Sequence, residues 1–142
     1  MLKAVIDTTV WISGVFWHGL PNEILELWKA GDFEIIVSEA ILEEIERKLH
    51  EKAVEFEMET EVVSEWIDLI TIEAIFVQPQ EKIQACRDPE DELFLKAAVE
   101  GRADFIVSGD KDLTDMGEFR EIKLVKPRQF YDFLTRDRES LN

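Results

Sequence analysis

Two stretches decide the fold: Leu2-Lys3-Ala4-Val5-Ile6-Asp7 and Asp104-Phe105-Ile106-Val107-Ser108-Gly109-Asp110. Each is a short apolar run, typical of a buried strand, that ends in an aspartate. In an open parallel sheet, ligands bind in the crevice beyond the carboxyl ends of the strands. We therefore expect Asp7 and Asp110 to face each other across such a crevice.

Short β-branched runs alternate with amphipathic stretches along the chain, a pattern typical of βαβ units. It predicts an α/β fold with three layers, in which helices cover both faces of a central, mostly parallel sheet. Strands are predicted at 2–7, 33–37, 71–77, 104–108 and 121–125. Helices are predicted near 20–30 and at 38–50, 60–69, 89–100, 111–117 and 127–134, with 51–59 as a helical or loose connection.

Length and composition indicate one domain. The 142 residues contain no Gly/Pro/Ser-rich linker and no repeat, so we assign residues 1–134 to a single domain and residues 135–142 to a polar tail. Cys86 is the only cysteine, which rules out an intrachain disulfide. His18 and His50 lie too far apart in the sequence to suggest a zinc site.

The net charge of −16 argues against a protein that coats nucleic acid, because it repels phosphodiester backbones at long range. Nucleic-acid chemistry would therefore need cations. No apolar run approaches the roughly 18 residues of a membrane span. The residues before Asp7 are too few for the apolar core of a signal peptide, so we expect a soluble, cytoplasmic protein without a membrane partner.

Acids that could meet at the predicted crevice occur at four places, and each has a simpler structural explanation. Asp7 could form only a turn, in which its carboxylate accepts a backbone N–H. In the predicted helix 38–50, Glu44 and Glu46 both flank the buried stripe, whereas Glu43 points furthest outward. Spacing therefore leaves Glu44 and Glu46 open as the second acid.

The other two places lie at predicted helix starts. Asp88 could be an N-cap and Asp91 the second acid of a capping box. Asp110 could likewise be a cap or turn residue. The conjunction of these positions favours a site, because turn chemistry has no reason to collect acids at one edge of the sheet.

Clustered carboxylates raise one another's pKa and need a counter-charge, which Mg²⁺ or Mn²⁺ supplies. A cluster without histidine or cysteine favours these hard cations. Such ions activate water for attack on phosphorus and stabilise charge on the leaving oxygen. The sequence therefore predicts a metal site that hydrolyses phosphodiesters.

Four segments, in order, resemble the PIN-domain family, and specifically the small prokaryotic toxin components of toxin–antitoxin pairs. The segments are Val5–Ser13, Ser38–Leu49, Arg87–Ala98 and Val107–Leu113. The alignment selects Asp7, Glu44, Asp91 and Asp110 as the family's four acids. It also identifies Asp88 and Asp112 as neighbouring or accessory acids and Ser108 as the family's small hydroxyl residue.

This resemblance implies a metal-dependent endoribonuclease, with Mg²⁺ or Mn²⁺ as cofactor. The four acids would be both catalytic residues and metal ligands, with Asp88 and Asp112 as further candidate ligands. It also implies an RNA substrate, a small cognate antitoxin as protein partner, and a homodimer or higher homo-oligomer.

Two alternatives stay open. Asp7-Thr8-Thr9-Val10 resembles a shortened nucleophile motif of haloacid-dehalogenase-type phosphatases, although Thr9 stands where hydrolytic members usually carry an acid/base aspartate. The second alternative is a catalytically silent PIN-like module that binds a partner. Most of the four Trp and nine Phe are expected in the core, but Trp17 lies in a predicted loop and could contribute to an exposed binding patch.

Overall fold

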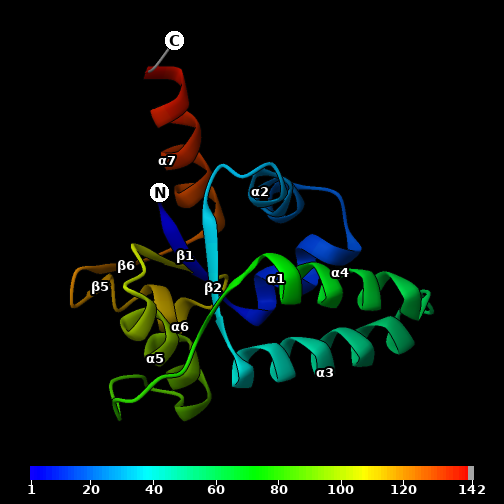
Figure 1. Ribbon diagram of the computed structural model, residues 1–142, viewed down its shortest axis with the longest axis horizontal. Helices are drawn as coiled ribbons and strands as arrows, with labels where there is room; N and C mark the ends of the chain where they lie inside the picture. Colours follow the sequence, from blue (N-terminus) through cyan, green and yellow to red (C-terminus); the bar gives the residue numbers. More distant parts are fainter. Residues whose placement is uncertain (141–142) are drawn as a thin grey trace.

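A six-stranded sheet in the order β3-β2-β1-β4-β6-β5 forms the centre of the computed structural model, which describes residues 1–140 (Figure 1). The strands are β1 (Lys3–Ile6), β2 (Glu34–Ser38), β3 (Ile75–Val77), β4 (Phe105–Val107), β5 (Glu118–Phe119) and β6 (Ile122–Val125). Every neighbouring pair is parallel except β5 and β6. The predicted α/β fold with a mostly parallel sheet is confirmed.

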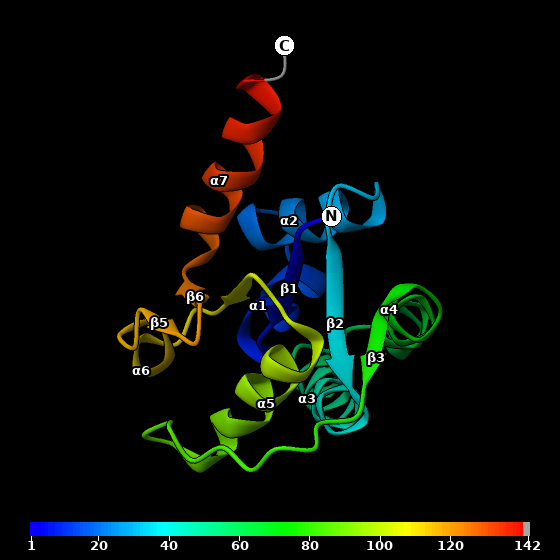
Figure 2. The same cartoon turned by 60° about the vertical axis from the view of Figure 1, so that its left-hand side comes forward.

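Helices flank this sheet on both sides. They are α1 (Thr8–Phe16), α2 (Leu20–Lys29), α3 (Glu39–Glu55), α4 (Thr60–Glu73), the 3₁₀ turn η1 (Pro89–Asp91), α5 (Glu92–Gly101), α6 (Lys111–Thr114) and α7 (Pro127–Ser140). Helix α5 packs across β1 to β4, while α7 packs against β4 and α2 (Figure 2). No helix of residues 1–140 combines the length and the apolar character needed to cross a membrane.

The core joins strands and helices through aromatic side chains. Trp11 of α1 is fully buried, with its ring centroid 5.8 Å from Trp28 and 6.3 Å from Trp66. Phe130 of α7 is fully buried between the rings of Phe33 and Phe105, at 5.0 and 5.4 Å. These contacts fix α1 and α7 against the sheet, so the loops at the edge of the sheet are attached to a well-packed core.

The strand order changes direction at β1, and this places the candidate site. β2 and β3 lie on one side of β1, whereas β4 and β6 lie on the other. Ile6 is in register with Val107, so the residues that follow β1 and β4 leave the sheet side by side. Open α/β sheets bind ligands at such a reversal of the strand order.

Helix α1 was not predicted, because residues 8–16 are rich in β-branched side chains of low helix propensity. It forms because the Asp7 carboxylate caps its amino end, accepting the Val10 N–H at 3.1 Å, and because Trp11 buries its apolar face. Tertiary packing has overridden local preference here.

Three further boundaries differ from the sequence prediction. Residues 71–73, expected in a strand, form the last turn of α4, where the Thr71 hydroxyl donates to the Ile67 carbonyl at 2.8 Å. The two-residue strand β5 is too short to give a periodic signal. Helix α7 continues through Ser140, so most of the predicted tail 135–142 extends this helix, and residues 141–142 lie outside the described residues. The domain boundary at 134 stays a prediction.

Candidate active site

Asp7 lies at the carboxyl end of β1 and is almost completely buried, with 2% of its surface exposed. One carboxylate oxygen accepts the Thr9 hydroxyl at 2.7 Å and the Val10 N–H at 3.1 Å. The other oxygen accepts the hydroxyl of Ser108, which follows β4. The first turn of α1 and the residue after β4 therefore hold this carboxylate in a fixed orientation from both sides.

Burial raises the pKa of Asp7 above its ordinary value, although hydrogen bonds from Ser108, Thr9 and Val10 oppose that shift. The negative charge of Asp110 raises it further. Among the described residues, the groups that shift the pKa of Asp7 do not include a positive counter-charge. A bound cation would supply one.

Ser108 also ties Asp110 to this arrangement. Its fully buried hydroxyl oxygen accepts the Asp110 N–H at 2.9 Å while its proton goes to Asp7. The Asp110 carboxylate in turn accepts the Asp112 N–H at 2.9 Å and caps α6. The capping role proposed from sequence for Asp110 is therefore real, and it fixes the acid beside Asp7.

Asp91 differs from the other acids. Asp88, not Asp91, caps the turn η1, accepting the Glu90 N–H at 3.0 Å. Within residues 1–140 the Asp91 carboxylate makes no capping hydrogen bond. Burial, followed by the charges of Asp110, Asp88, Asp7 and Asp112, raises the pKa of Asp91 to about 6. Asp91 therefore lies among other acids, and its carboxylate does not act as a helix cap.

Glu44 reaches the same region from α3. It is half-buried, whereas Glu43 and Glu46 are exposed, so the structure distinguishes the residue that the family alignment selected. Its carboxylate forms an ion pair with Arg47 at 3.3 Å, and this pair raises the pKa of the arginine. Because Arg47 is exposed, the pair is a weak one that Glu44 can exchange for another cation.

All four acids selected from the sequence line one cavity of about 240 Å³. They reach it from four separate segments: the end of β1, helix α3, the turn η1 and the loop after β4. Asp88 and Asp112 do not line it, and Asp112 pairs with Arg87 at 3.5 Å. The cavity lining also contains Thr8, Thr9, Ile12, Lys48, Lys52, Glu90 and Phe94.

The donor set of this cavity fits a hard divalent cation. Its acids offer only carboxylate oxygens, which Mg²⁺ and Mn²⁺ prefer. The Thr8 hydroxyl is buried in the same lining and has no hydrogen-bond partner among the described residues. No three His, Cys, Asp or Glu side chains of residues 1–140 are arranged as a ready metal site.

Sequence reasoning missed the two lysines of the cavity. Lys48 and Lys52 follow Glu44 at intervals of four residues, which places all three on neighbouring turns of α3. That spacing was a usable signal, but the surrounding run of glutamates obscured it. The lysines bring positive charge to the lining of the acidic cavity.

Comparison with known proteins agrees with this arrangement. Residues 3–112, which include all four acids, match the model of the PIN domain. The chain is also similar to an uncharacterized protein of Methanocaldococcus jannaschii. The two are 28% identical over 141 residues, which covers 92% of this chain and 90% of the relative. Because the family match spans most of the chain, the protein belongs to the PIN domain family, whose members are generally nucleases.

Proposed function

We propose that this protein is a divalent-metal-dependent endoribonuclease whose active site is the cavity lined by Asp7, Glu44, Asp91 and Asp110. The observation that carries the proposal is the convergence of these four acids, from four segments, on one cavity beside two lysines. Structural roles as helix caps explain Asp7 and Asp110 but leave Asp91 unexplained, since its carboxylate caps nothing. Its raised pKa supports a site built for a cation.

A bound Mg²⁺ or Mn²⁺ would activate a water for attack on phosphorus and stabilise the leaving oxygen. Asp7, held by Ser108 and Thr9, would be the fixed ligand, and Glu44 and Asp110 would complete the set. The cation would also draw the pKa of Asp91 back towards its ordinary value, so we assign Asp91 a binding role rather than that of a base. Lys48 and Lys52 would hold phosphates next to the cleaved bond.

The phosphatase alternative loses support. The family match favours the PIN domain over the whole region that carries the acids. In addition, the Thr9 side chain donates its hydroxyl to Asp7 and supplies no second acid at that position. Asp7 is therefore better suited to hold a cation than to act as a nucleophile.

The biological role is the second part of the proposal. The sequence resemblance supports a toxin that cleaves RNA in the cytoplasm, is inhibited by a small cognate antitoxin, and acts as a homodimer or higher homo-oligomer. If so, induced expression of the wild-type chain without its partner should arrest bacterial growth, whereas Asp7→Asn should not. Equal growth of the two strains at equal protein levels would contradict the toxin role.

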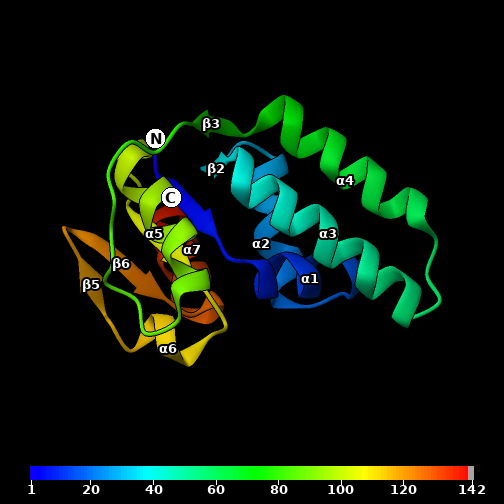
Figure 3. The same cartoon turned by 90° about the horizontal axis from the view of Figure 1, so that it is seen from below.

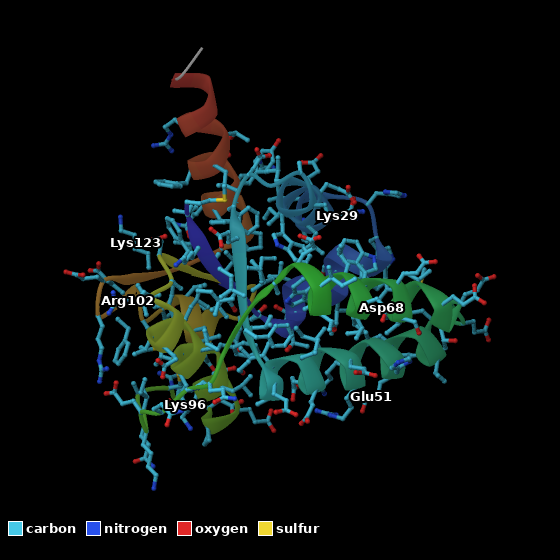
Figure 4. All side chains as sticks on the ribbon, in the orientation of Figure 1. Lys29, Glu51, Asp68, Lys96, Arg102 and Lys123 are labelled. Carbon is cyan, nitrogen blue, oxygen red and sulfur yellow. The ribbon has the colours of Figure 1, made fainter. Side chains whose placement is uncertain are left out.

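RNA cleavage tests the biochemical proposal. Purified wild-type protein should cut a mixed panel of single-stranded and structured RNAs in Mn²⁺ or Mg²⁺ and leave them intact in EDTA. Asp7→Asn should remove cleavage, and the matched control Asp68→Asn should not, because Asp68 lies on α4 away from the cavity lining (Figure 4). Cleavage by the Asp7 variant would indicate a contaminating nuclease or a different site. Absence of cleavage in every ion would favour a silent PIN scaffold.

A further inference from the structure

Three aromatic side chains gather where α1 and α3 end. The ring centroids of Trp17 and Phe56 lie 4.9 Å apart, and Phe16 lies 6.0 Å from Trp17 and 6.3 Å from Phe56. Phe16 is buried and supports the other two, whereas Trp17 is 47% exposed and Phe56 38% exposed. We call this exposed pair the Trp17–Phe56 platform. Nothing in the proposed chemistry at the acids uses it.

The platform lies outside the lining of the acidic cavity, at the far end of the helix that carries Glu44. Asp7 directly precedes α1 and Glu44 lies in α3, and these two helices pack against each other (Figure 3). Along α3, Glu44, Lys48, Lys52 and Phe56 follow one another at intervals of four residues, about 6 Å per step of the helix axis. The first three line the cavity, and the Lys52 amino group lies 5.7 Å from the Phe56 ring centroid. Acids, cations and aromatic rings therefore follow in that order.

Lys48 and Lys52 line the cavity and are the cations that a phosphate-bearing chain would meet here, although Glu51, Glu55 and Glu57 lie in the same stretch. Lys48 and Lys52 pair with Glu51 and Glu55 at 3.9 and 3.0 Å, but these glutamates are more than half exposed. Exposed pairs of this kind contribute little, so the lysines can exchange them for phosphates. The exposed apolar neighbours Val54 and Met58 are aliphatic, so Trp17 and Phe56 are the flat rings of this surface on which a base can stack.

We propose that the Trp17–Phe56 platform is a base-stacking subsite for single-stranded RNA. It would hold an unpaired base several nucleotides from the cleaved bond, while Lys48 and Lys52 bind the phosphates between. The two rings meet at 70°, so they present faces of different orientation rather than a slot, and the base stacks on the exposed ring of Trp17. This inference rests on the proposed ribonuclease function and specifies that the substrate is unpaired at this position.

Binding without cleavage tests the subsite. A labelled oligouridine RNA is titrated with the protein in EDTA at low salt, and its fluorescence anisotropy is recorded. Trp17→Ala should weaken binding by about 5- to 150-fold, the range expected for one stacked base. Trp17→Phe should restore most of the affinity. Phe76→Ala should leave it unchanged, because Phe76 is an exposed ring on β3 outside the cavity lining.

A second measurement separates stacking from a general change of the surface. A single abasic nucleotide is moved along the RNA, one position at a time. Removal of the base at one position should weaken binding to the wild type but not to the Trp17→Ala variant, as expected when that base stacks on the Trp17 ring. The inference is overturned if the wild type does not bind the RNA, if no position behaves in this way, or if Trp17→Ala instead changes the oligomeric mass in sedimentation.

The subsite and the ribonuclease function can fail separately. RNA cleavage that depends on Asp7 but is indifferent to Trp17→Ala would refute the subsite alone. Base-dependent binding at Trp17 without cleavage in any metal would refute the ribonuclease and leave an RNA-binding protein.

Discussion

Replacement of Asp91 by asparagine should stabilise the metal-free protein while abolishing RNA cleavage. The Asp91 carboxylate caps no helix, and burial together with four neighbouring acids raises its pKa from 3.8 to about 6. An asparagine at this position would keep the shape of the side chain and remove its charge. The substitution should therefore relieve repulsion without the loss of a capping bond.

The magnitude follows from the pKa of Asp91. A rise from 3.8 to about 6 corresponds to about 3 kcal/mol for a fully buried group. Asp91 is partly exposed, so solvent screening reduces this to about 1 kcal/mol, or roughly 3 °C in Tm. Because the folded pKa is raised, the stability contributed by Asp91 is present below about pH 4 and is lost as the pH rises through 6. The gain in the variant should thus be largest above pH 7 and fade towards pH 4.

Thermal unfolding in EDTA, followed by circular dichroism at several pH values, measures this effect. Asp68→Asn is the matched control, since it changes the net charge equally at an exposed position of α4. Excess Mn²⁺ should then raise the Tm of the wild type more than that of Asp91→Asn, because the cation binds the folded site. A metal-free Asp91 variant that is no more stable than the Asp68 variant at pH 8 would refute the repulsion among these acids.

Three other substitutions test the site and its support. Ser108→Ala should cost about 1–3 kcal/mol in urea unfolding and reduce cleavage, because it leaves the buried Asp7 carboxylate short of a donor; an unchanged stability would contradict the bridging role. Gly14→Ala should cost about 1–3 kcal/mol, more than its gain in helix propensity, because the added Cβ would lie 2.5 Å from Leu25 Cδ1; a more stable variant would show that this contact relaxes freely. Glu44→Gln should impair cleavage far more than the same change at its exposed neighbours Glu43 and Glu46; equal effects would place the second acid elsewhere.

Much of the fold could be predicted because buried parallel strands are continuous apolar runs. β1 and β4 were identified in this way, and with them the acids that follow. Helix α1 could not be predicted, because its side chains favour strands, and it is stabilised as a helix by the Asp7 cap and by burial of residues such as Trp11 and Phe16. Residues 71–73 were wrongly predicted as part of a strand for the same reason, since their local preference favours a strand but tertiary contacts extend α4 through them.

The candidate site could likewise be predicted only in part. Strand ends indicated Asp7 and Asp110 as candidates, the helix start indicated Asp91, and the family resemblance selected Glu44, because spacing alone did not separate Glu44 from Glu46. That separation depends on the rotation of α3 about its axis, which packing against α4, α1 and β2 determines. The dual role of Ser108 and the two cavity lysines likewise became apparent only when the strands and helices were placed in space.

Direct binding of Mn²⁺ to the metal-free protein tests the central claim, that the four acids form a divalent-cation site. Isothermal titration calorimetry would compare the wild type with Asp7→Asn and Asp68→Asn. We predict saturable binding of Mn²⁺ to the wild type and to the Asp68 variant, and loss of that binding in the Asp7 variant. Absence of binding to the wild type, or equal binding by all three proteins, would contradict a metal site at this cavity.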